Sequence, residues 1–184
     1  MVLVIGISGV TNGGKTSITN ELKKRWKKQF VLHTVHQDDY YKDEADIAVD
    51  PQNGLLQWDV PEAFHMVQMK AAIKESILKL EQSPSQTILI VEGILLFCDS
   101  DLNKMFDRRY FLTLPLDEAK LRRGNRVYEP PDVPGLFEKH VWPMYLHYKR
   151  QMEKYVENVV ILDGTNDFKT VVDSVQSDVV QFLQ

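Results

Sequence analysis

The chain has 184 residues, of which 43% are hydrophobic and 26% are charged, and its formal net charge is −4. This length predicts one domain over residues 1–184 that can bury a hydrophobic core. The negative charge argues against a nucleic-acid partner, and no apolar run approaches the ~20 residues that a membrane helix needs.

The N-terminus begins with an apolar strand, expected at residues 2–7, without the basic segment of a signal peptide. The single cysteine, Cys98, cannot form an internal disulfide, which is typical of a reducing compartment. Cys98 follows an apolar strand, so we interpret it as a small buried hydrophobic residue. We therefore expect a cytoplasmic protein, and nothing in the sequence indicates an obligate protein partner.

A glycine-rich turn follows the first strand and opens a helix expected over residues 15–29. The turn matches the pattern GxxxxGK(S/T), in the run Gly9-Val10-Thr11-Asn12-Gly13-Gly14-Lys15-Thr16, and Ser17 comes next. Glycines let backbone N–H groups surround a phosphate, and the helix N-terminus adds positive potential. The pattern predicts that Lys15 reaches the β- and γ-phosphates of ATP and that Thr16 ligates Mg²⁺.

A second strand is expected at residues 30–35, and two carboxylates, Asp38 and Asp39, follow it. At the carboxyl end of a strand, one of them is a candidate general base for an attacking hydroxyl. The alternative is that the pair only forms a turn or caps a helix.

A long helix is predicted to begin at Pro61 and to end before Ser83. Its apolar face consists of Met66, Met69, Ile73, Ile77 and Leu80. The third strand, at residues 87–91, ends at Glu92, where an acid can hold Mg²⁺ through water. Because an unpaired acid in that place would be costly, we interpret Glu92 as part of a metal site.

A fourth strand is expected at residues 110–114, and the helix after it, 117–126, ends in three arginines. These are Arg122, Arg123 and Arg126. Guanidinium forks suit phosphate oxygens, whereas the ordinary preference for cations at helix ends explains one arginine better than three. With the proline-rich segment that follows, they predict a small lid over about residues 122–137 that excludes water.

The remaining elements are a helix near residues 141–156, a fifth strand at 159–162 and a last helix at 167–183. Strands separated by helices predict an α/β P-loop fold, with a mainly parallel five-stranded sheet covered on both faces. Ligands bind outside the carboxyl ends of the strands in such folds. We interpret His140 and His147 as structural or surface residues, because their spacing suggests no zinc site.

Several segments of the chain resemble nicotinamide riboside kinases in order and spacing. They are Thr11–Thr16, His36–Lys42, Gln57–Val60, Val91–Gly93, Arg122–Tyr128, His140–Tyr145 and Leu162–Gly164. The chain is more distantly similar to uridine kinases. The resemblance implies ATP- and Mg²⁺-dependent phosphorylation of the 5′-hydroxyl of nicotinamide riboside, and of nicotinic acid riboside, for NAD synthesis.

The resemblance also implies a role for each matching residue. Asp38 would be the catalytic base, next to the Mg²⁺ held by Thr16. The riboside pocket would comprise Asp38, Asp39, Tyr40, Tyr41, Trp58, Asp59, Arg123, Tyr128 and Glu129, with Asp59 and Arg123 on the ribose hydroxyls and Trp58 and Tyr128 on the ring. Outside the glycine-rich turn, ATP would contact Arg122, Arg126, Val127, Tyr128, Asn166, Asp167 and Phe168. Two aromatic faces also suit the pyridinium charge of this substrate.

Other classes fit the sequence less well. A GTPase would need an Asn-Lys-x-Asp motif, but Asn103-Lys104 is followed by Met105-Phe106. An AAA-type ATPase would normally be longer. Two alternatives remain at this point, a general nucleoside kinase of the uridine and cytidine type and a non-catalytic nucleotide-binding adaptor. An adaptor would not need the intact set of Lys15, Thr16, Asp38 and Glu92.

Overall fold

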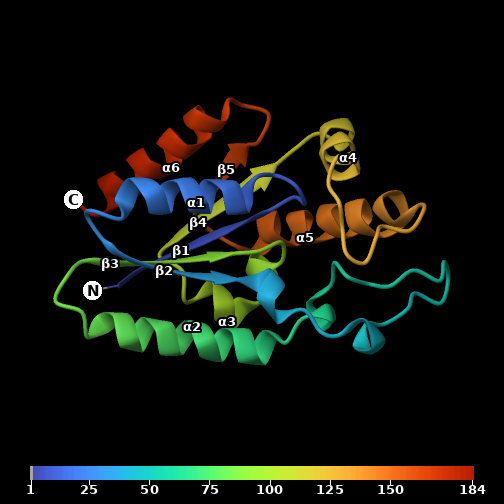
Figure 1. The fold of residues 1–184 in the computed structure, drawn as a ribbon, viewed down its shortest axis with the longest axis horizontal. Helices are drawn as coiled ribbons and strands as arrows, with labels where there is room; N and C mark the ends of the chain where they lie inside the picture. The colour runs from blue at the N-terminus through green and yellow to red at the C-terminus, as the bar shows by residue number, and fades with distance from the viewer. Residues whose placement is uncertain (1) are drawn as a thin grey trace.

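The computed structural model describes residues 2–184, in which a five-stranded sheet lies between two layers of helices (Figure 1). The strands are β1 (Val2–Gly9), β2 (Val31–His36), β3 (Thr87–Glu92), β4 (Arg108–Thr113) and β5 (Val159–Asp163). Their order in the sheet is β2-β3-β1-β4-β5, and every neighbouring pair is parallel. The predicted fold is confirmed, and the sheet is parallel throughout.

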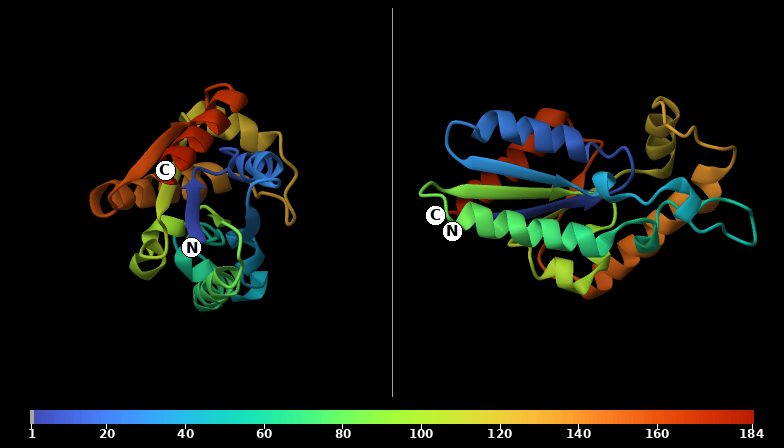
Figure 2. Two further views of the ribbon diagram at one scale, coloured as in Figure 1. Left: turned by 90° about the vertical axis from the view of Figure 1, so that its left-hand side faces the viewer. Right: turned by 60° about the horizontal axis from the view of Figure 1, so that its bottom comes forward.

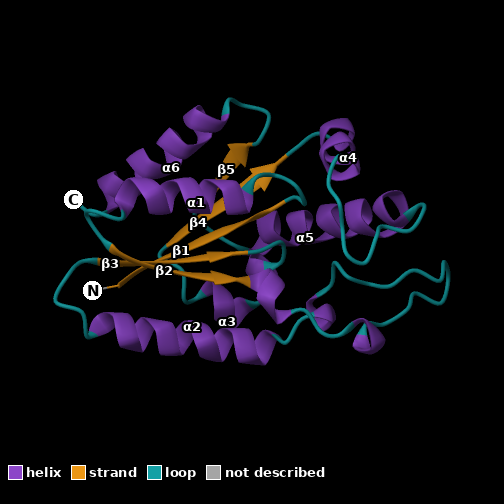
Figure 3. Cartoon of the chain, viewed as in Figure 1, coloured by secondary structure: helices purple, strands orange, loops and turns teal. Residues whose placement is uncertain are grey.

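Helices cover both faces of this sheet, as Figure 2 and Figure 3 show. They are α1 (Lys15–Trp26), α2 (Met66–Glu81), α3 (Ser100–Asn103), α4 (Leu116–Gly124), α5 (Trp142–Tyr155) and α6 (Phe168–Phe182). Helices α1 and α6 pack on one face, while α2, α3 and α5 pack on the other. None of the helices within residues 2–184 is both long and apolar enough to cross a membrane.

Strand β1 shows why a central strand of this sheet is apolar along most of its length. Alternate side chains point to opposite faces of a sheet. Leu3 and Ile5 therefore pack in one core cluster with Leu22 of α1, whereas Val4 packs in the other with Met69 of α2. Both faces are buried, so both sets of positions must be apolar.

The long second helix differs from its prediction at its start. Residues Pro61–Ala63 form a separate 3₁₀ turn, and α2 begins only at Met66. Phe64, between them, has extended backbone angles, is 3% exposed and packs against the ring of Tyr41 at a centroid distance of 4.1 Å. Packing of this side chain therefore overrides the helix-starting preference of Pro61. The predicted apolar face of α2 is confirmed, with Met69 fully buried.

The parallel register brings the polar strand ends to one edge of the sheet. Glu92 at the end of β3 lies beside Ile7 of β1 on one side and His36 of β2 on the other. The turn that begins at Gly9 and the segment after His36 therefore meet at this edge. Helix α4 and the long loops also extend beyond it (Figure 1).

Candidate active site

The phosphate-binding turn depends on glycine at two positions. Gly9 has a φ of +128°, and a Cβ there would lie 2.2 Å from the carbonyl oxygen of Leu112. Gly14, with a φ of +95°, precedes α1 and provides no side-chain cap. The first turn of α1 also contains no acidic residue. Its backbone N–H groups are therefore available to an anion, as the sequence pattern predicts.

The ammonium group of Lys15 is buried beside this turn. It donates hydrogen bonds to the carbonyl oxygens of Val10 at 2.9 Å and Gly9 at 3.4 Å. Burial lowers the pKa of Lys15, and the negative charges of Glu92 and Asp38 partly oppose this effect. The turn thus holds a cation at the place where the sequence predicts phosphates.

Glu92 connects the phosphate-binding turn to strand β2. Its Oε1 accepts a hydrogen bond from the Thr16 hydroxyl at 2.8 Å and lies 2.7 Å from Nδ1 of His36. Glu92 is 5% exposed, and these contacts offset part of the cost of its burial. The acid is thus paired without a metal, so the cost of an unpaired acid does not by itself indicate a metal site at Glu92. The role of His36 was missed, because the two residues are 56 positions apart.

The structure separates the two neighbouring aspartates that follow β2. Asp38 lines the main cavity of the site, together with Lys15 and Glu92. The protein atoms around its carboxylate raise the pKa of Asp38, and the nearby charge of Lys15 opposes this rise. Both aspartates are exposed to solvent, but Asp39 is not among the residues that line the cavity. This placement favours Asp38 as the base.

The main cavity has a volume of about 650 Å³ and extends from the phosphate-binding turn to the lid. Its size lies within the usual range for small-molecule sites. Of the predicted riboside pocket it includes Asp38, Tyr41, Trp58, Asp59, Arg123, Tyr128 and Glu129. Tyr40 instead packs against the core cluster that contains Met69.

Asp59 and Trp58 line the cavity together, and Asp59 also lines a small neighbouring pocket with Gly9 and Thr11 of the phosphate-binding turn. Asp59 is 9% exposed, and burial raises its pKa to about 6, although the charge of Arg123 opposes this rise. The backbone N–H of Asp59 donates to Nε2 of His140 at 3.1 Å. His140 is therefore structural and buried rather than on the surface. The Trp58 ring meets the ring of Tyr41 edge-on, at 5.8 Å between centroids.

The lid contacts the phosphate-binding turn through Tyr128 and two arginines. The Tyr128 hydroxyl accepts a hydrogen bond from Nδ2 of Asn12 at 2.9 Å. The guanidinium groups of Arg123 and Arg126 lie over the Tyr128 ring, at 4.4 Å and 5.1 Å from its centroid. Arg123 Nη1 also donates to the Thr11 hydroxyl at 3.0 Å. These contacts hold both guanidinium groups beside the phosphate-binding turn, and the charge of Asp59 also acts on Arg123.

Arg122 points to a different part of the edge. It donates to Glu118 at 2.6 Å and to the carbonyl oxygen of Gly164 at 3.0 Å, and it does not line the main cavity. Gly164 packs close to Gly13, because a Cβ on Gly164 would lie 3.4 Å from the Gly13 carbonyl oxygen. Arg122 therefore fixes the β5–α6 loop against the phosphate-binding turn.

The other residues expected to contact ATP lie outside the main cavity. Asn166 and Asp167 belong to the β5–α6 loop, and the Asp167 carboxylate caps α6 by accepting from the backbone N–H of Thr170 at 3.1 Å. Phe168, the first residue of α6, is 46% exposed, and Val127 in the lid is 95% exposed. The loop lies beside the phosphate-binding turn, so a contact with the base of ATP stays a prediction.

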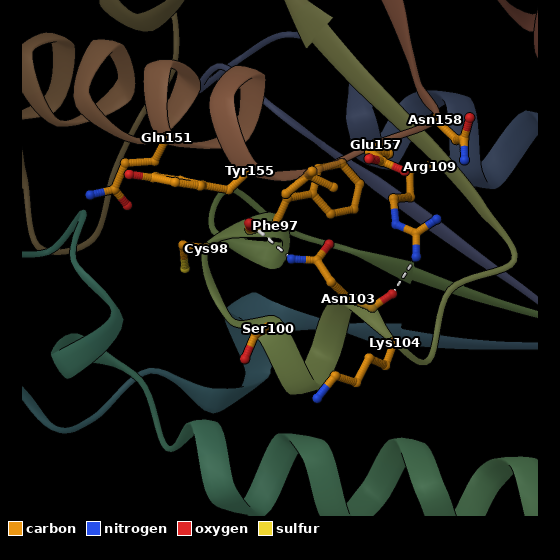
Figure 4. Close-up of a pocket in the computed structure, with 11 residues that line it drawn as sticks. Phe97, Cys98, Ser100, Asn103, Lys104, Arg109, Gln151, Tyr155, Glu157 and Asn158 are labelled. Carbon is orange, nitrogen blue, oxygen red and sulfur yellow. Dashed lines mark hydrogen bonds between the residues drawn. The ribbon is translucent and has the colours of Figure 1, made fainter.

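A second hollow of about 450 Å³ lies between η4 (Leu96–Cys98), α3 and the end of α5 (Figure 4). Most of the polar side chains described here form hydrogen bonds with backbone carbonyl oxygens of the protein. Arg109 donates to the carbonyl oxygen of Asn103, and Nδ2 of Asn103 donates to that of Phe97 at 3.0 Å. The Cys98 thiol donates to the carbonyl oxygen of Leu95, and burial raises its pKa to about 12. None of the predicted site residues lines this hollow.

Comparisons with known proteins agree with this geometry. The model of a family described as an AAA domain matches residues 5–143. The matched residues include the phosphate-binding turn, Asp38, Glu92 and the lid.

The similar proteins of known function are small-molecule kinases. The chain is 44% identical to nicotinamide riboside kinase 1 of Rattus norvegicus, over 98% of this chain and 95% of the relative. It is 39% identical to nicotinamide riboside kinase 2 of Homo sapiens, over 100% of this chain and 85% of the relative. A uridine kinase of Chlamydia pneumoniae is 27% identical, over 87% of this chain and 82% of the relative.

Solved structures support the fold. A possible uridine kinase from Bacillus stearothermophilus superposes with a TM-score of 0.57 at 17% identity, covering 86% of this chain and 88% of the other. A deoxyadenosine kinase from M. mycoides gives a TM-score of 0.55 at 15% identity, covering 96% and 99%. At such identities the likeness concerns the fold alone.

Proposed function

Because the chain belongs to the AAA-domain family and, by its relatives, to the nicotinamide riboside kinases, we propose that it phosphorylates nicotinamide riboside. The γ-phosphoryl group of ATP is transferred to the 5′-hydroxyl, which gives the mononucleotide and ADP. Nicotinic acid riboside is the second substrate, and both products feed NAD synthesis. The observation that carries the proposal is one cavity that joins Lys15, Asp38 and the pair of Trp58 and Asp59.

The residues at the phosphate end fit a magnesium ion. Mg²⁺ prefers oxygen ligands and keeps several waters and phosphate oxygens in its coordination shell. The hydroxyl of Thr16 and the carboxylates of Asp38 and Glu92 are such ligands, with Glu92 acting through water. Within residues 2–184 no cluster of three His, Cys, Asp or Glu side chains could hold a metal alone. When bound, Mg²⁺ neutralises the charge that develops between the β- and γ-phosphates.

The protein groups around the phosphates supply positioning and a base. Asp38 accepts the proton of the 5′-hydroxyl as the oxygen attacks the γ-phosphorus. Lys15 and Arg126 stabilise negative charge on the phosphoryl oxygens during transfer. Both cations are already held in place, Lys15 by the carbonyl oxygens of the turn and Arg126 by Asn12 and Tyr128.

The part of the cavity around Asp59 suits a ribose with a cationic ring. The Asp59 carboxylate can accept hydrogen bonds from two hydroxyl groups, and the Arg123 guanidinium can donate to their oxygens. Trp58 provides an aromatic face, which attracts a pyridinium ion more strongly than a neutral base. Glu44 and Glu129 also line the cavity and add negative charge.

A coupled assay for ADP tests the proposal directly. The purified protein should release ADP from ATP and Mg²⁺ only after nicotinamide riboside is added, and mass spectrometry should detect the mononucleotide. Lys15→Met is the control, because it removes the phosphate-binding cation. A non-catalytic adaptor would bind ATP without releasing ADP under any condition. A general nucleoside kinase would release ADP as readily with uridine, and either result would contradict the proposal.

A further inference from the structure

The imidazole of His140 is buried in contact with Asp59. His140 is 4% exposed, and its Nε2 accepts the backbone N–H of Asp59 at 3.1 Å. The same nitrogen lies 3.7 Å from Oδ2 of the Asp59 carboxylate. His140 is not among the residues that line the cavity. It can therefore act on a ligand only through Asp59.

A local departure from α-helical geometry aims His140 at this position. Residues Phe137–Val141 form a turn of π-helix that runs directly into α5. Pro143, in the first turn of α5, has no N–H to donate to the carbonyl oxygen four residues earlier, so an α-helical turn is weakened there. Single π turns change the direction of a side chain and often occur at functional sites.

The π turn is anchored to both ends of the site. Phe137 and Val141 are buried in one cluster with Val10 of the phosphate-binding turn and Leu55, which precedes the Trp58–Asp59 segment. Leu136 of the lid belongs to the same cluster. The π turn that carries His140 therefore packs against both the lid and the phosphate-binding turn. Small displacements of the π turn would be transmitted to Asp59.

The hydrogen bond determines which form of the ring is present. To accept the N–H of Asp59, Nε2 must be unprotonated, so the neutral ring carries its proton on Nδ1. Burial lowers the pKa of His140, the charge of Asp50 opposes this, and the positive charge of Arg123 adds to it. The carboxylate of Asp59 also faces the ring. The neutral form is therefore the one expected at neutral pH.

We propose that His140 is a positioning residue that fixes the main chain of Asp59, so that its carboxylate meets the ribose hydroxyls of the substrate. The inference rests on the proposed function, because it assigns Asp59 to the ribose. A misplaced Asp59 weakens riboside binding, whereas Lys15 keeps its own hydrogen bonds to the carbonyl oxygens of Gly9 and Val10. The signature is therefore a change in the riboside KM without an equal change in the ATP KM.

Two variants separate positioning from packing. His140→Gln places an amide oxygen near the position of Nε2 and retains an acceptor, whereas His140→Leu fills the space without one. We expect His140→Leu to raise the riboside KM about three- to tenfold, which is the change in affinity that corresponds to the loss of one neutral hydrogen bond. The ATP KM and kcat should stay within about twofold. His140→Gln should stay within about twofold of the wild type in all three quantities.

The melting temperatures of the wild type, His140→Leu and His140→Gln show whether either substitution destabilises the folded protein. If Leu preserved the riboside KM and Gln did not, or if both variants matched the wild type, the inference would be overturned while riboside phosphorylation stood. An absence of riboside turnover by the wild type would instead overturn the proposed function and, with it, the ribose role of Asp59. A nitrogen-15 NMR spectrum of the ring, assigned with His140→Gln, should show Nε2 unprotonated at pH 7. A protonated Nε2 would also overturn the inference.

Discussion

Arg123 and Asp132 form a two-pronged ion pair within the lid, with Nε and Nη2 of the arginine 2.5 Å and 2.9 Å from different carboxylate oxygens. The third nitrogen, Nη1, donates to the Thr11 hydroxyl of the phosphate-binding turn. Asp132 thus orients the guanidinium that we assign to the ribose. It also neutralises part of the positive charge that the lid presents to the cavity.

Asp132→Asn should raise the riboside KM about fivefold, which corresponds to about 1 kcal/mol. The estimate is modest because the Asp132 side chain is 31% exposed and water screens the pair. Steady-state kinetics at saturating ATP provide the measurement. Asp101→Asn, which removes the exposed pair with Lys104 at 3.2 Å, is the matched control and should change nothing. An unchanged riboside KM in Asp132→Asn would show that Arg123 is oriented without its partner.

Asp38→Asn should reduce kcat by roughly 10²–10⁴, the range for loss of a positioned general base. The amide keeps the shape of the carboxylate but cannot take a proton. Asp39→Asn is the control, because this neighbour does not line the cavity. Binding of an ATP analogue, measured by titration calorimetry, should change little in either variant. If Asp39→Asn caused the larger loss, the roles of the two aspartates would be reversed.

Asp59→Asn should abolish tight riboside binding and yet stabilise the free protein at neutral pH. The folded pKa of Asp59, about 6, lies above the value of about 3.9 expected in the unfolded chain. A raised pKa means that the protonated form favours folding, and this contribution is lost as the pH rises from 4 through 6. Above that range the buried charge costs on the order of 1–3 kcal/mol.

Thermal unfolding of wild type and Asp59→Asn between pH 4.5 and 8 checks this prediction. The variant should melt at least about 2 °C higher at pH 8, and the difference should shrink toward zero as the pH approaches 4. A constant difference over the range would mean that the charge of Asp59 is not the cause. A lower melting temperature of the variant at pH 8 would mean that the ionised carboxylate is well compensated by Arg123.

Features encoded in short stretches of sequence could be predicted well. The phosphate-binding turn, the five strands and the apolar face of α2 follow from glycine spacing and hydrophobic periodicity, which are local properties. The contacts that refine the site are not local. Glu92 meets His36 across 56 positions, and Asp59 meets His140 across 81. No periodic pattern reports such a pair, so His36 and Asp132 were missed.

The three lid arginines illustrate the same limit. Their composition and their place at the end of α4 predicted a phosphate-binding group. The position of an arginine in the sequence of a helix does not determine where its side chain points. In the structure Arg122 hydrogen-bonds to Gly164, whereas Arg123 and Arg126 line the cavity. Which side chain faces the ligand depends on the fold of the lid after α4. That fold is set by tertiary contacts, such as those between Tyr128 and Asn12.

Trp58 provides the test of substrate choice. Its ring makes a T-shaped contact with the ring of Tyr41, which in turn packs on Phe64. These contacts fix the orientation of the aromatic ring at position 58. Such a face attracts the pyridinium ring of either riboside by roughly 0.5–2 kcal/mol. Because π-faces do not distinguish a carboxamide from a carboxylate, we expect kcat/KM values for the two ribosides within about tenfold, or about 1.4 kcal/mol.

Uridine, which has no pyridinium charge, should be a clearly poorer substrate of the wild type. Trp58→Ala should reduce the preference for the ribosides over uridine by roughly two- to thirtyfold, the factor that corresponds to one cation–π contact. Trp58→Tyr should largely retain it, because the phenol ring keeps the π-face and can still pack on Tyr41. Competition assays with all three nucleosides on the wild type and both variants measure these ratios directly. If uridine matched the ribosides on the wild type, ring charge would not govern selection, and the site would be that of a general nucleoside kinase.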